Sequence, residues 1–517
     1  MRRNLEGLSS KTYDVAIVGG GITGACIARD AALRGLSVAL VDKGDFAGAT
    51  TSASSKLIHG GLRYLEHLEL GIVRESLRER RVWSNVAPHM IDAITFLMPT
   101  TGRGVRKRLV MTLGLTAYDW LAYDRNRLDD PSKSIPSHKS LTREQVLELE
   151  PGLAESDITG ALVFYDYQMY SPERLCLECI LDAAQRGADM ANYVEALGFV
   201  QEEGRVTGLR VRDTLADGDP FDIRARVTVN AAGPWADILM AQVDEQHPRR
   251  LIRSKGIHLI TRALTEQHAI AVRAADDHFF ILPWRGYSIL GTTDTLYEGD
   301  PDDVHASEKD IVNFLARVNE GYPAAKLRRS DVRFFYAGLR PIVDTREAEG
   351  EGEAGEAKPD SYTASRAAEV HDHATAEGLE GMVTVVGGKW TTSRALAEQV
   401  VDRLVSKLEL DDRPCLTDTT PTYGGEVGRF GEYTKQMIAK YPALPASLVE
   451  HLARNYGSHM EEVIALTRER PELLEAVSPE FPDIGAQVVH AVRDEMAATM
   501  EDVLFRRTGL GTLGSPG

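Results

Sequence analysis

The hydrophobic pattern near the N-terminus changes its period twice within a short stretch. An unbroken apolar run over residues 15–18 predicts a fully buried parallel strand. Over residues 22–33 the apolar positions recur at helical spacing, and a glycine ends that pattern. A second apolar run over residues 38–41 predicts another strand, which ends at Asp42. The order strand, helix, strand predicts a βαβ unit whose two strands are parallel.

The turn between the first strand and the helix has the spacing GxGxxG, with glycines at positions 19, 21 and 24. Such glycines allow a tight turn, close approach of the backbone to a pyrophosphate, and close packing of helix on strand. The helix N-terminus offers free N–H groups to phosphates, and an acidic residue after the second strand accepts ribose hydroxyls. The unit therefore predicts a dinucleotide site formed by Gly19, Gly21, Ile22, Thr23, Gly24, Asp42 and Lys43.

Two later segments also place glycine-rich backbone at the end of an apolar strand, at residues 230–235 and 387–392. Residues 44–67 are rich in small hydroxyl side chains, which suit a loop that runs along a polar ligand. An NAD enzyme needs mainly the first glycine turn. A flavin nucleotide also has a ribityl chain and a ring to hold, and would use all three segments.

The pattern changes again in the second half of the chain. Short alternating or aromatic runs over residues 251–343 predict an antiparallel sheet in a separate, substrate-side unit. Residues 346–381 are rich in Glu, Ala and Gly and predict a surface excursion. Beyond residue 420 the spacing predicts several helices, the last of them over residues 484–504.

Composition narrows the class of protein. The chain has 517 residues and a formal net charge of -18, which disfavours nucleic acid as a partner. No apolar run approaches the roughly 18 residues of a membrane-spanning helix, and the start lacks the apolar region of a secretory signal, so a cytoplasmic location is expected. Four cysteines are too few for a disulfide framework. Cys176 and Cys179 fall within a helical pattern and are expected to be buried, and no metal site is predicted.

Two helical segments carry clustered basic residues. Residues 65–86 predict an amphipathic helix whose arginines, Arg80 among them, face outward. Residues 103–127 place Arg103, Arg106, Lys107 and Arg108 before a series of large apolar residues. In an acidic protein, such a basic amphipathic segment is typical of a helix that binds a membrane surface. The same pattern is equally consistent with a helix that packs on the core and has a solvated basic end.

Longer motifs resemble those of FAD-dependent glycerol-3-phosphate dehydrogenases. They are IVGGGITGACIARDAALRG, TTSASSKLIHGGLRYLEH, NAAGPWAD, RSKGIHL, ILGTTD, YAGLRP and VVGGKWTTSRALAE, in this order between residues 13 and 400. The resemblance implies an α/β fold of three parts. These are a discontinuous Rossmann-like FAD-binding domain of the glutathione-reductase/D-amino-acid-oxidase type over residues 13–95, 160–245 and 380–410, an antiparallel-sheet substrate domain over residues 96–159 and 246–379, and an α-helical C-terminal domain over residues 420–517.

The resemblance also implies how FAD is held, without a covalent bond. The first glycine turn and Asp42 would hold the pyrophosphate and the adenosine ribose, although the family more often has Glu at position 42. The backbone of Val194 would meet the adenine. The helix that begins near Thr391 would point its N-terminus at the flavin ring and stabilise the anionic reduced form. The other implied FAD contacts are Thr50, Ser52, Ser54, Ser55, Lys56, His59, Ala232, Gly233, Gly388, Lys389 and Thr391.

A phosphorylated substrate needs a forked donor or more than one cation. The resemblance implies that catalysis uses His59, His258, Arg340 and Lys389, and that the substrate is bound by Arg63, Tyr64, Thr293, Asp294 and Arg366. One of the two histidines would take the proton from the C2 hydroxyl as hydride leaves C2 for flavin N5. Arg366 departs from the family pattern, because Ala367 follows it where the family has an acidic residue.

These features predict oxidation of sn-glycerol 3-phosphate to dihydroxyacetone phosphate, with the electrons passed to a membrane quinone. The alternatives are another polyol phosphate such as erythritol phosphate, oxygen as the electron acceptor, and a flavin-binding module without catalysis. The expected partners are the substrate, a quinone and the anionic inner face of the cell membrane. A homodimer is left open.

Overall fold

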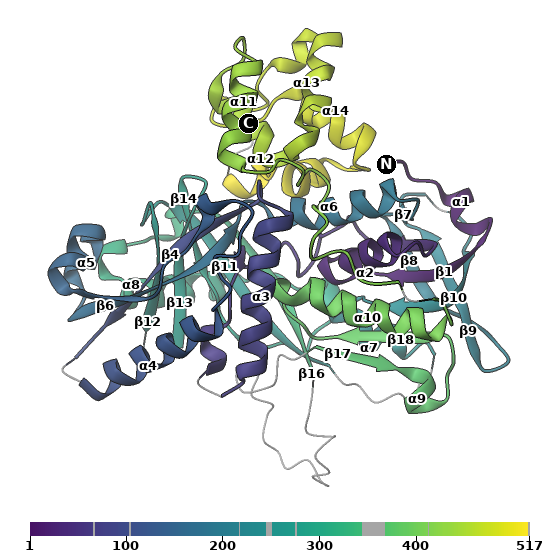
Figure 1. Cartoon of the computed structure of the whole chain (residues 1–517), viewed down its shortest axis with the longest axis horizontal. Coiled ribbons are helices and arrows are strands. Elements are labelled where there is room, and N and C mark those ends of the chain that lie inside the picture. The colour runs from purple at the N-terminus through teal and green to yellow at the C-terminus, as the bar shows by residue number, and fades with distance from the viewer. Residues whose placement is uncertain are drawn as a thin grey trace, which may run out of the picture.

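The computed structural model describes residues 1–65, 68–102, 105–216, 218–243, 251–274, 277–343, 368–411 and 413–514 (Figure 1). Two sheets lie side by side, and a cluster of helices from the C-terminal part of the chain stands against them. Arg366 and Arg103 lie outside the described residues, as do the side chains of Arg63, Arg106, Lys107 and Arg108.

The first sheet has eight strands, and its main path runs β17-β18-β10-β1-β2-β7. The pairs β18–β10, β10–β1, β1–β2 and β2–β7 are parallel, as the βαβ pattern predicts. β8 and β9 extend the sheet as antiparallel strands through β10. The strands are β1 (Thr12–Val18), β2 (Val38–Val41), β7 (Asp189–Ala191), β8 (Val194–Glu202), β9 (Arg205–Asp213), β10 (Phe221–Asn230), β17 (Glu369–Asp372) and β18 (Met382–Val386).

Three helices cover one face of this sheet: α2 (Ile22–Leu33), α6 (Pro172–Gln185) and α10 (Ser393–Lys407). α2 packs against both α6 and α10, and the shared core contains buried Val15, Ile17 and Leu40. Cys176 and Cys179 lie on α6 inside the same core, fully buried as the helical pattern predicts.

The second sheet has ten strands in the order β15-β11-β14-β13-β12-β4-β6-β3, with β16 on β11 and β5 on β6. It is antiparallel except for the pair β12–β4. α8 (Glu308–Gly321) packs against β12. The strands are β3 (Leu57–Ile58), β4 (Ile91–Thr100), β5 (Lys139–Thr142), β6 (Gly160–Met169), β11 (Leu251–Arg262), β12 (His268–Ala274), β13 (Asp277–Trp284), β14 (Tyr287–Gly291), β15 (Thr295–Leu296) and β16 (Val332–Val343).

The sheet pairing crosses the division of the chain that the sequence predicts. Residues 91–95 and 160–169 fall within the predicted FAD-binding ranges, yet β4 and β6 pair over their whole length in the second sheet. Conversely, β17 falls in the predicted substrate range and pairs with β18 in the first sheet. The reason is that the strands of the two sheets have similar apolar patterns in the sequence. Only the hydrogen bonds between strands show to which sheet each strand belongs.

A buried ion pair joins α3 (Leu70–Val86) to β6, and it corrects the prediction that Arg80 faces outward. Arg80 is 1% exposed and its guanidinium pairs with Asp166. The same carboxylate accepts the Tyr118 hydroxyl at 2.9 Å and the Gly60 N–H at 3.1 Å. Burial of a charge requires such partners, so this network fixes the backbone just before Tyr64.

Asp166→Ala is expected to lower the free energy of unfolding by about 3–5 kcal/mol, because it leaves the buried Arg80 charge without its partner. Chemical denaturation of the purified protein measures the effect. Asp222→Ala is the matched control, since Asp222 pairs with Arg210 at the surface and such pairs contribute about 0–1 kcal/mol. Equal losses in the two variants would contradict a structural role for the buried pair.

The C-terminal helices are α11 (Phe430–Lys440), α12 (Ala446–Tyr456), α13 (Met460–Glu469) and α14 (Gly485–Asp494). The predicted helix over residues 484–504 is wrong in its extent, because α14 ends at Asp494 and a short π-helical segment covers Asp502–Arg507. The interruption places Glu495 in a buried ion pair with Arg174 of α6, whose Nη1 donates to both carboxylate oxygens at 2.9 Å. This pair ties the helical cluster to the first sheet.

α4 (Val105–Leu121) exposes several large apolar side chains to solvent. Leu109 is 56%, Val110 62%, Leu113 61% and Trp120 77% exposed. Within the described ranges, none of the helices combines the length and the hydropathy that crossing a bilayer requires.

Candidate active site

The first glycine turn has no room for side chains. Gly19 has φ +104°, and a Cβ there would lie 2.5 Å from the Ala231 carbonyl oxygen at the end of β10. A Cβ on Gly24 would lie 1.9 Å from the Gly19 carbonyl oxygen. Gly21 caps α2 without a side-chain hydrogen bond. The turn therefore presents bare backbone and the positive end of a helix, which is the cradle a pyrophosphate needs.

Asp42 lies at the end of β2, beside this turn. Its carboxylate accepts the Gly20 N–H at 2.6 Å and the Gly44 N–H at 2.9 Å. Burial raises the pKa of Asp42 to about 6. Its backbone carbonyl accepts the Val194 N–H at 2.7 Å, so Val194 lies next to the predicted ribose site. Lys43 points away: its ammonium lies over the Trp235 ring at 4.3 Å and pairs with Asp302.

FAD affinity is expected to fall as the pH drops through about 6, because the Asp42 carboxylate, the predicted acceptor of a ribose hydroxyl, becomes protonated. Above that pH the carboxylate is ionised and affinity reaches its plateau. Equilibrium titration of the apoprotein with FAD at several pH values measures the effect. In Asp42→Asn affinity is expected to be lower and flat over the same range. A wild-type affinity that does not change between pH 5 and 7 would contradict this role.

The hydroxyl-rich loop over residues 49–55 connects the two sheets. The Thr51 hydroxyl accepts the Ile22 N–H at 2.9 Å, at the first turn of α2. The Thr50 hydroxyl donates to the Leu339 carbonyl of β16 at 2.7 Å. Ser52 and Ser54 bond within the loop, to Ala49 and Lys56. The loop therefore runs from the dinucleotide turn to the second sheet, as a ligand-side loop should.

Lys56, a predicted FAD contact, has a buried side chain that contacts Glu173 and Trp284. Its side chain is 1% exposed and its ammonium bonds to Glu173 at 2.8 Å, close to the Trp284 ring. Burial lowers the pKa of this lysine while Glu173 opposes the change. The side chain thus anchors the loop to α6 beneath the site.

One face of the paired strands β11 and β16 carries two of the four predicted catalytic residues, His258 and Arg340. Ser254 lies opposite Arg340, and His258 lies opposite Tyr336. Between these two pairs, Gly256 lies opposite Gly338. A Cβ on Gly256 would lie 2.3 Å from Arg340 Nη2, and one on Gly338 would lie 2.5 Å from Ala53 Cβ. Two glycines therefore let the hydroxyl-rich loop and the Arg340 side chain approach the sheet.

Arg340 is held by hydroxyls and one backbone carbonyl. Nη2 donates to the Thr292 hydroxyl at 2.7 Å, Nη1 to the Ser254 hydroxyl at 3.2 Å, and both to the Thr293 carbonyl at 3.3 Å. Asp294 Oδ2 lies 3.9 Å from Nη1, beyond hydrogen-bond distance. Hydroxyls and a carbonyl thus hold the half-buried fork in a fixed orientation, with the Asp294 carboxylate nearby, and a fixed guanidinium fork is the kind of donor that binds phosphate.

His258 is kept neutral. Its ring is 1% exposed, stacks on Tyr336 at 4.9 Å between centroids, and places Nε2 2.8 Å from the Ser55 hydroxyl. Burial, with help from the charges of Arg340 and Lys56, holds the pKa of His258 well below its usual range. A neutral imidazole in hydrogen-bond contact with a hydroxyl has a lone pair that can take a proton.

The third glycine segment meets the loop that follows residue 56. The Thr391 hydroxyl accepts the His59 N–H at 3.2 Å. Lys389 Nζ donates to the Ser76 hydroxyl at 2.7 Å and lies 4.2 Å above the Tyr64 ring. α10 begins just beyond, at Ser393, after a short 3₁₀ turn over Trp390–Thr392. The structure thus brings together the predicted residues His59, Tyr64, Lys389 and Thr391 from distant parts of the chain.

The second glycine segment lies directly against the first. Ala232 N–H donates to the Asn230 side chain at 3.2 Å, and Gly233 has φ +55°. Gly19 abuts Ala231 and Ala232, and Gly388, with φ +87°, follows the neighbouring strand β18. All three predicted glycine segments therefore lie at the carboxyl ends of adjacent parallel strands, where α/β sheets bind ligands. The backbone of Arg63 lies in the short 3₁₀ turn Leu62–Leu65, beside Tyr64.

Ser254, Thr292 and Tyr336 take part in the site although the sequence analysis did not single them out. All three lie inside motifs that it quoted, and strand alternation was the signal available. With a period of two, Ser254 shares a face with His258, and Tyr336 shares a face with Arg340. Asp166 accepts the Gly60 N–H, and nothing near it in the sequence predicts this role, because its side-chain partners lie on α3 and α4.

Two protein-family models match this chain, and together they cover most of its length. Residues 14–403 match the model of the family described as FAD dependent oxidoreductase, and residues 415–515 match the C-terminal domain of alpha-glycerophosphate oxidase. The chain belongs to the family of FAD-dependent glycerol-3-phosphate dehydrogenases and oxidases, and its cofactor is FAD.

Relatives with these names cover nearly the whole chain. A glycerol-3-phosphate dehydrogenase of Synechocystis is 36% identical over 98% of this chain and 90% of its own length. One of Mycobacterium leprae is 35% identical over 97% and 82%. The solved structure of glycerol-3-phosphate dehydrogenase from Bacillus halodurans complexed with FAD is 28% identical, with a TM-score of 0.77 over 98% of this chain and 88% of that one.

Proposed function

We propose that this protein oxidises sn-glycerol 3-phosphate to dihydroxyacetone phosphate and passes the electrons to a membrane quinone. The observation that carries the proposal is the shared face of β11 and β16, where Arg340 and His258 lie four residue pairs apart, with Gly256 and Gly338 between them, next to the hydroxyl-rich loop. A cation for phosphate and an acceptor for a proton thus lie beside the cofactor segments. The names of the relatives support the same substrate.

In this proposal Arg340 binds the substrate phosphate through its fork, and Lys389 adds a second positive charge from the side of β18. Arg366 and Arg63 would add further charge. Thr293 and Asp294 lie along the Arg340 side chain and orient the polyol. Two cations suit a phosphomonoester better than a carboxylate, which favours a polyol phosphate over an amino acid.

The hydride step requires an acceptor for the C2 hydroxyl proton. FAD, when bound, supplies the hydride acceptor at the flavin ring. In this proposal His258 accepts the proton, because its ring lies on the shared face of β11 and β16 and the Ser55 hydroxyl fixes its Nε2. His59 is the alternative base, held beside Thr391 by its backbone N–H.

Anaerobic titration of the purified, FAD-loaded protein tests the function. Glycerol 3-phosphate is expected to bleach the flavin absorbance, and a quinone analogue is expected to restore it faster than oxygen does. An absorbance that does not change would rule out the activity and leave a flavin-binding module. Equal bleaching by erythritol phosphate would move the substrate assignment to the other polyol phosphate. Faster recovery with oxygen would make the protein an oxidase.

A membrane quinone requires the protein to approach the bilayer, and α4 is the element we propose for contact. Its exposed Leu109, Val110, Leu113 and Trp120 follow the basic residues at 103, 106, 107 and 108. Apolar side chains next to a basic cluster suit the interface of an anionic membrane. The proposal places the protein on the cytoplasmic face of the cell membrane.

Replacing Leu113 and Trp120 together by serine is expected to weaken binding to anionic phospholipid vesicles more than tenfold, because each buried side chain contributes about 1.5–3 kcal/mol. Neutralising Arg103, Arg106, Lys107 and Arg108 should also weaken binding and reduce its salt dependence. Vesicle co-sedimentation measures both. Val492→Ser on α14 is the control, since Val492 is 57% exposed on a different element. Unchanged binding in both sets would place the membrane contact elsewhere.

A further inference from the structure

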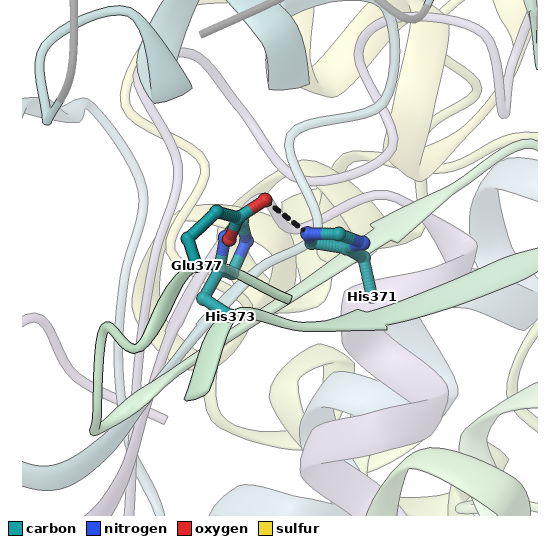
Figure 2. Close-up of side chains that lie close together, drawn as sticks. All are labelled: His371, His373 and Glu377. Carbon is teal, nitrogen blue, oxygen red and sulfur yellow. Dashed lines mark hydrogen bonds and ion pairs between the residues drawn. The ribbon is translucent and has the colours of Figure 1, made fainter. Parts of the chain in front are cut away.

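A cluster of three potential metal ligands lies at the edge of the first sheet, away from the glycine segments (Figure 2). His371 is in the edge strand β17, and His373 and Glu377 are on the short helix α9 (His373–Glu377) that follows it. Their nitrogen and oxygen donor atoms all lie within 4.8 Å of one another. The proposed activity does not use this cluster.

Both histidines face the same carboxylate. His371 Nε2 lies 2.7 Å from Glu377 Oε1, and His373 Nδ1 lies 2.5 Å from Glu377 Oε2. The two imidazole rings are 4.4 Å apart and nearly perpendicular. Figure 2 shows Glu377 next to His373, with a dashed line from a Glu377 oxygen to His371. The three side chains therefore converge on one point.

The hydrogen bonds behind His373 hold its ring in place. The Thr384 hydroxyl lies 2.9 Å from His373 Nε2 and 3.3 Å from Met240 Sδ. In the tautomer whose Nε2 proton is donated to Thr384, Nδ1 carries the lone pair that a metal ligand needs. A proton on Nδ1 accounts for its 2.5 Å contact with Glu377 Oε2, and a bound metal ion would replace that proton as the donor atoms move apart to metal–ligand distances.

We propose that His371 Nε2, His373 Nδ1 and the Glu377 carboxylate bind one divalent transition-metal ion, best satisfied by Zn²⁺. Imidazole and carboxylate donors suit zinc, and the combination of two histidines with one glutamate is a known zinc ligand set. The Thr384 hydroxyl orients His373 from behind, as partners of metal-bound histidines do. His373 is buried, whereas Glu377 is 32% exposed, so the ion reaches the site from solvent, and water completes its coordination.

Bound zinc would join β17 and α9 more firmly to the body of the sheet. β17 pairs with β18, with His371 opposite Thr384, and β18 leads directly to the third glycine segment at Gly388. An ion bound to the native state alone stabilises that state in proportion to the logarithm of its concentration. The site therefore has a structural role at the sheet edge, separate from the proposed chemistry.

Zinc binding to the FAD-loaded, chelator-treated protein tests the proposal. Isothermal titration with Zn²⁺ is expected to give one site per chain, together with an upward shift of Tm. His371→Ala and Glu377→Gln each remove one ligand and are expected to weaken affinity about 100-fold or more. Thr384→Val removes a hydrogen-bond partner that orients the ligand His373, and it is expected to weaken the affinity for Zn²⁺ about 10–100-fold. All three should keep their flavin spectrum, which separates loss of zinc from loss of fold.

His459→Ala is the matched control. His459 pairs with Glu462 at 2.8 Å on the surface, but it forms no such three-residue cluster in the described chain. Its Zn²⁺ affinity should equal that of the wild type. Failure of the wild-type protein to bind Zn²⁺, or equal affinity in wild type, His371→Ala and Glu377→Gln, would overturn the proposal. Binding that His459→Ala abolishes would assign zinc to a different site.

Discussion

Arg340→Ala is expected to raise KM for glycerol 3-phosphate about 100-fold and to leave FAD bound. Ser254, Thr292 and Thr293 hold the guanidinium in a fixed orientation on the face of β11 and β16 that we propose binds the substrate. Hydrogen bonds to a charged group contribute about 1.5–3 kcal/mol each, and a forked donor makes two. Every 1.4 kcal/mol is a factor of ten, so loss of the fork accounts for an effect of this size.

Steady-state kinetics with a quinone analogue, together with flavin absorbance, measure this prediction. Arg340→Lys should recover part of the affinity, because it restores the charge without the fork. Arg333→Ala is the matched control, since Arg333 is an exposed residue of the same strand, β16. Unchanged KM in Arg340→Ala would remove Arg340 from the substrate site, whereas loss of flavin would make it part of the cofactor site.

Gly24→Ala is expected to abolish FAD binding and to lower Tm. The new Cβ would lie 1.9 Å from the Gly19 carbonyl oxygen, which cannot move without displacing the whole turn between β1 and α2. Overpacking of this kind lowers the free energy of unfolding by about 1–3 kcal/mol, and by more where the backbone must shift. The purified variant should lack the yellow flavin spectrum, and calorimetry should show the lower Tm.

Gly431→Ala provides the control for this glycine. Gly431 lies in α11, and a Cβ there would meet no atom within 4 Å. Alanine at such a helical position stabilises by about 0.4–1 kcal/mol. Its FAD content should equal that of the wild type. A yellow Gly24→Ala protein with unchanged Tm would contradict the close helix–strand packing inferred from the glycine motif.

The sequence predicted those parts of the fold that depend on neighbouring residues. The change from strand to helical spacing around Gly19 and Gly24 is local, and β1, α2 and β2 form where it predicts them. The fold class and the cofactor are confirmed by the family and by the FAD-bound relative. The helical pattern around Cys176 and Cys179 also located α6.

The parts that the sequence does not show depend on partners far away in the chain. The local sequence predicts that Arg80 is exposed on an amphipathic helix. In the structure it pairs with Asp166 of β6, which is distant in the sequence. β4 and β6 belong to the second sheet because they pair with each other, which no local pattern shows. Lys56 pairs with Glu173 on α6, a partner that no local pattern shows, and its contact with FAD stays a prediction. Which of His59 and His258 acts as the base stays a prediction, and so does the part of Arg366.

The loop over residues 49–55 bonds to the start of α2 through Thr51 and to β16 through Thr50. A ligand that orders this loop from one side orders it for the other side as well. FAD and a phosphorylated substrate analogue should therefore bind with positive cooperativity. Thermodynamic linkage requires the factor to be the same in both directions: whatever the analogue adds to FAD affinity, FAD adds to affinity for the analogue.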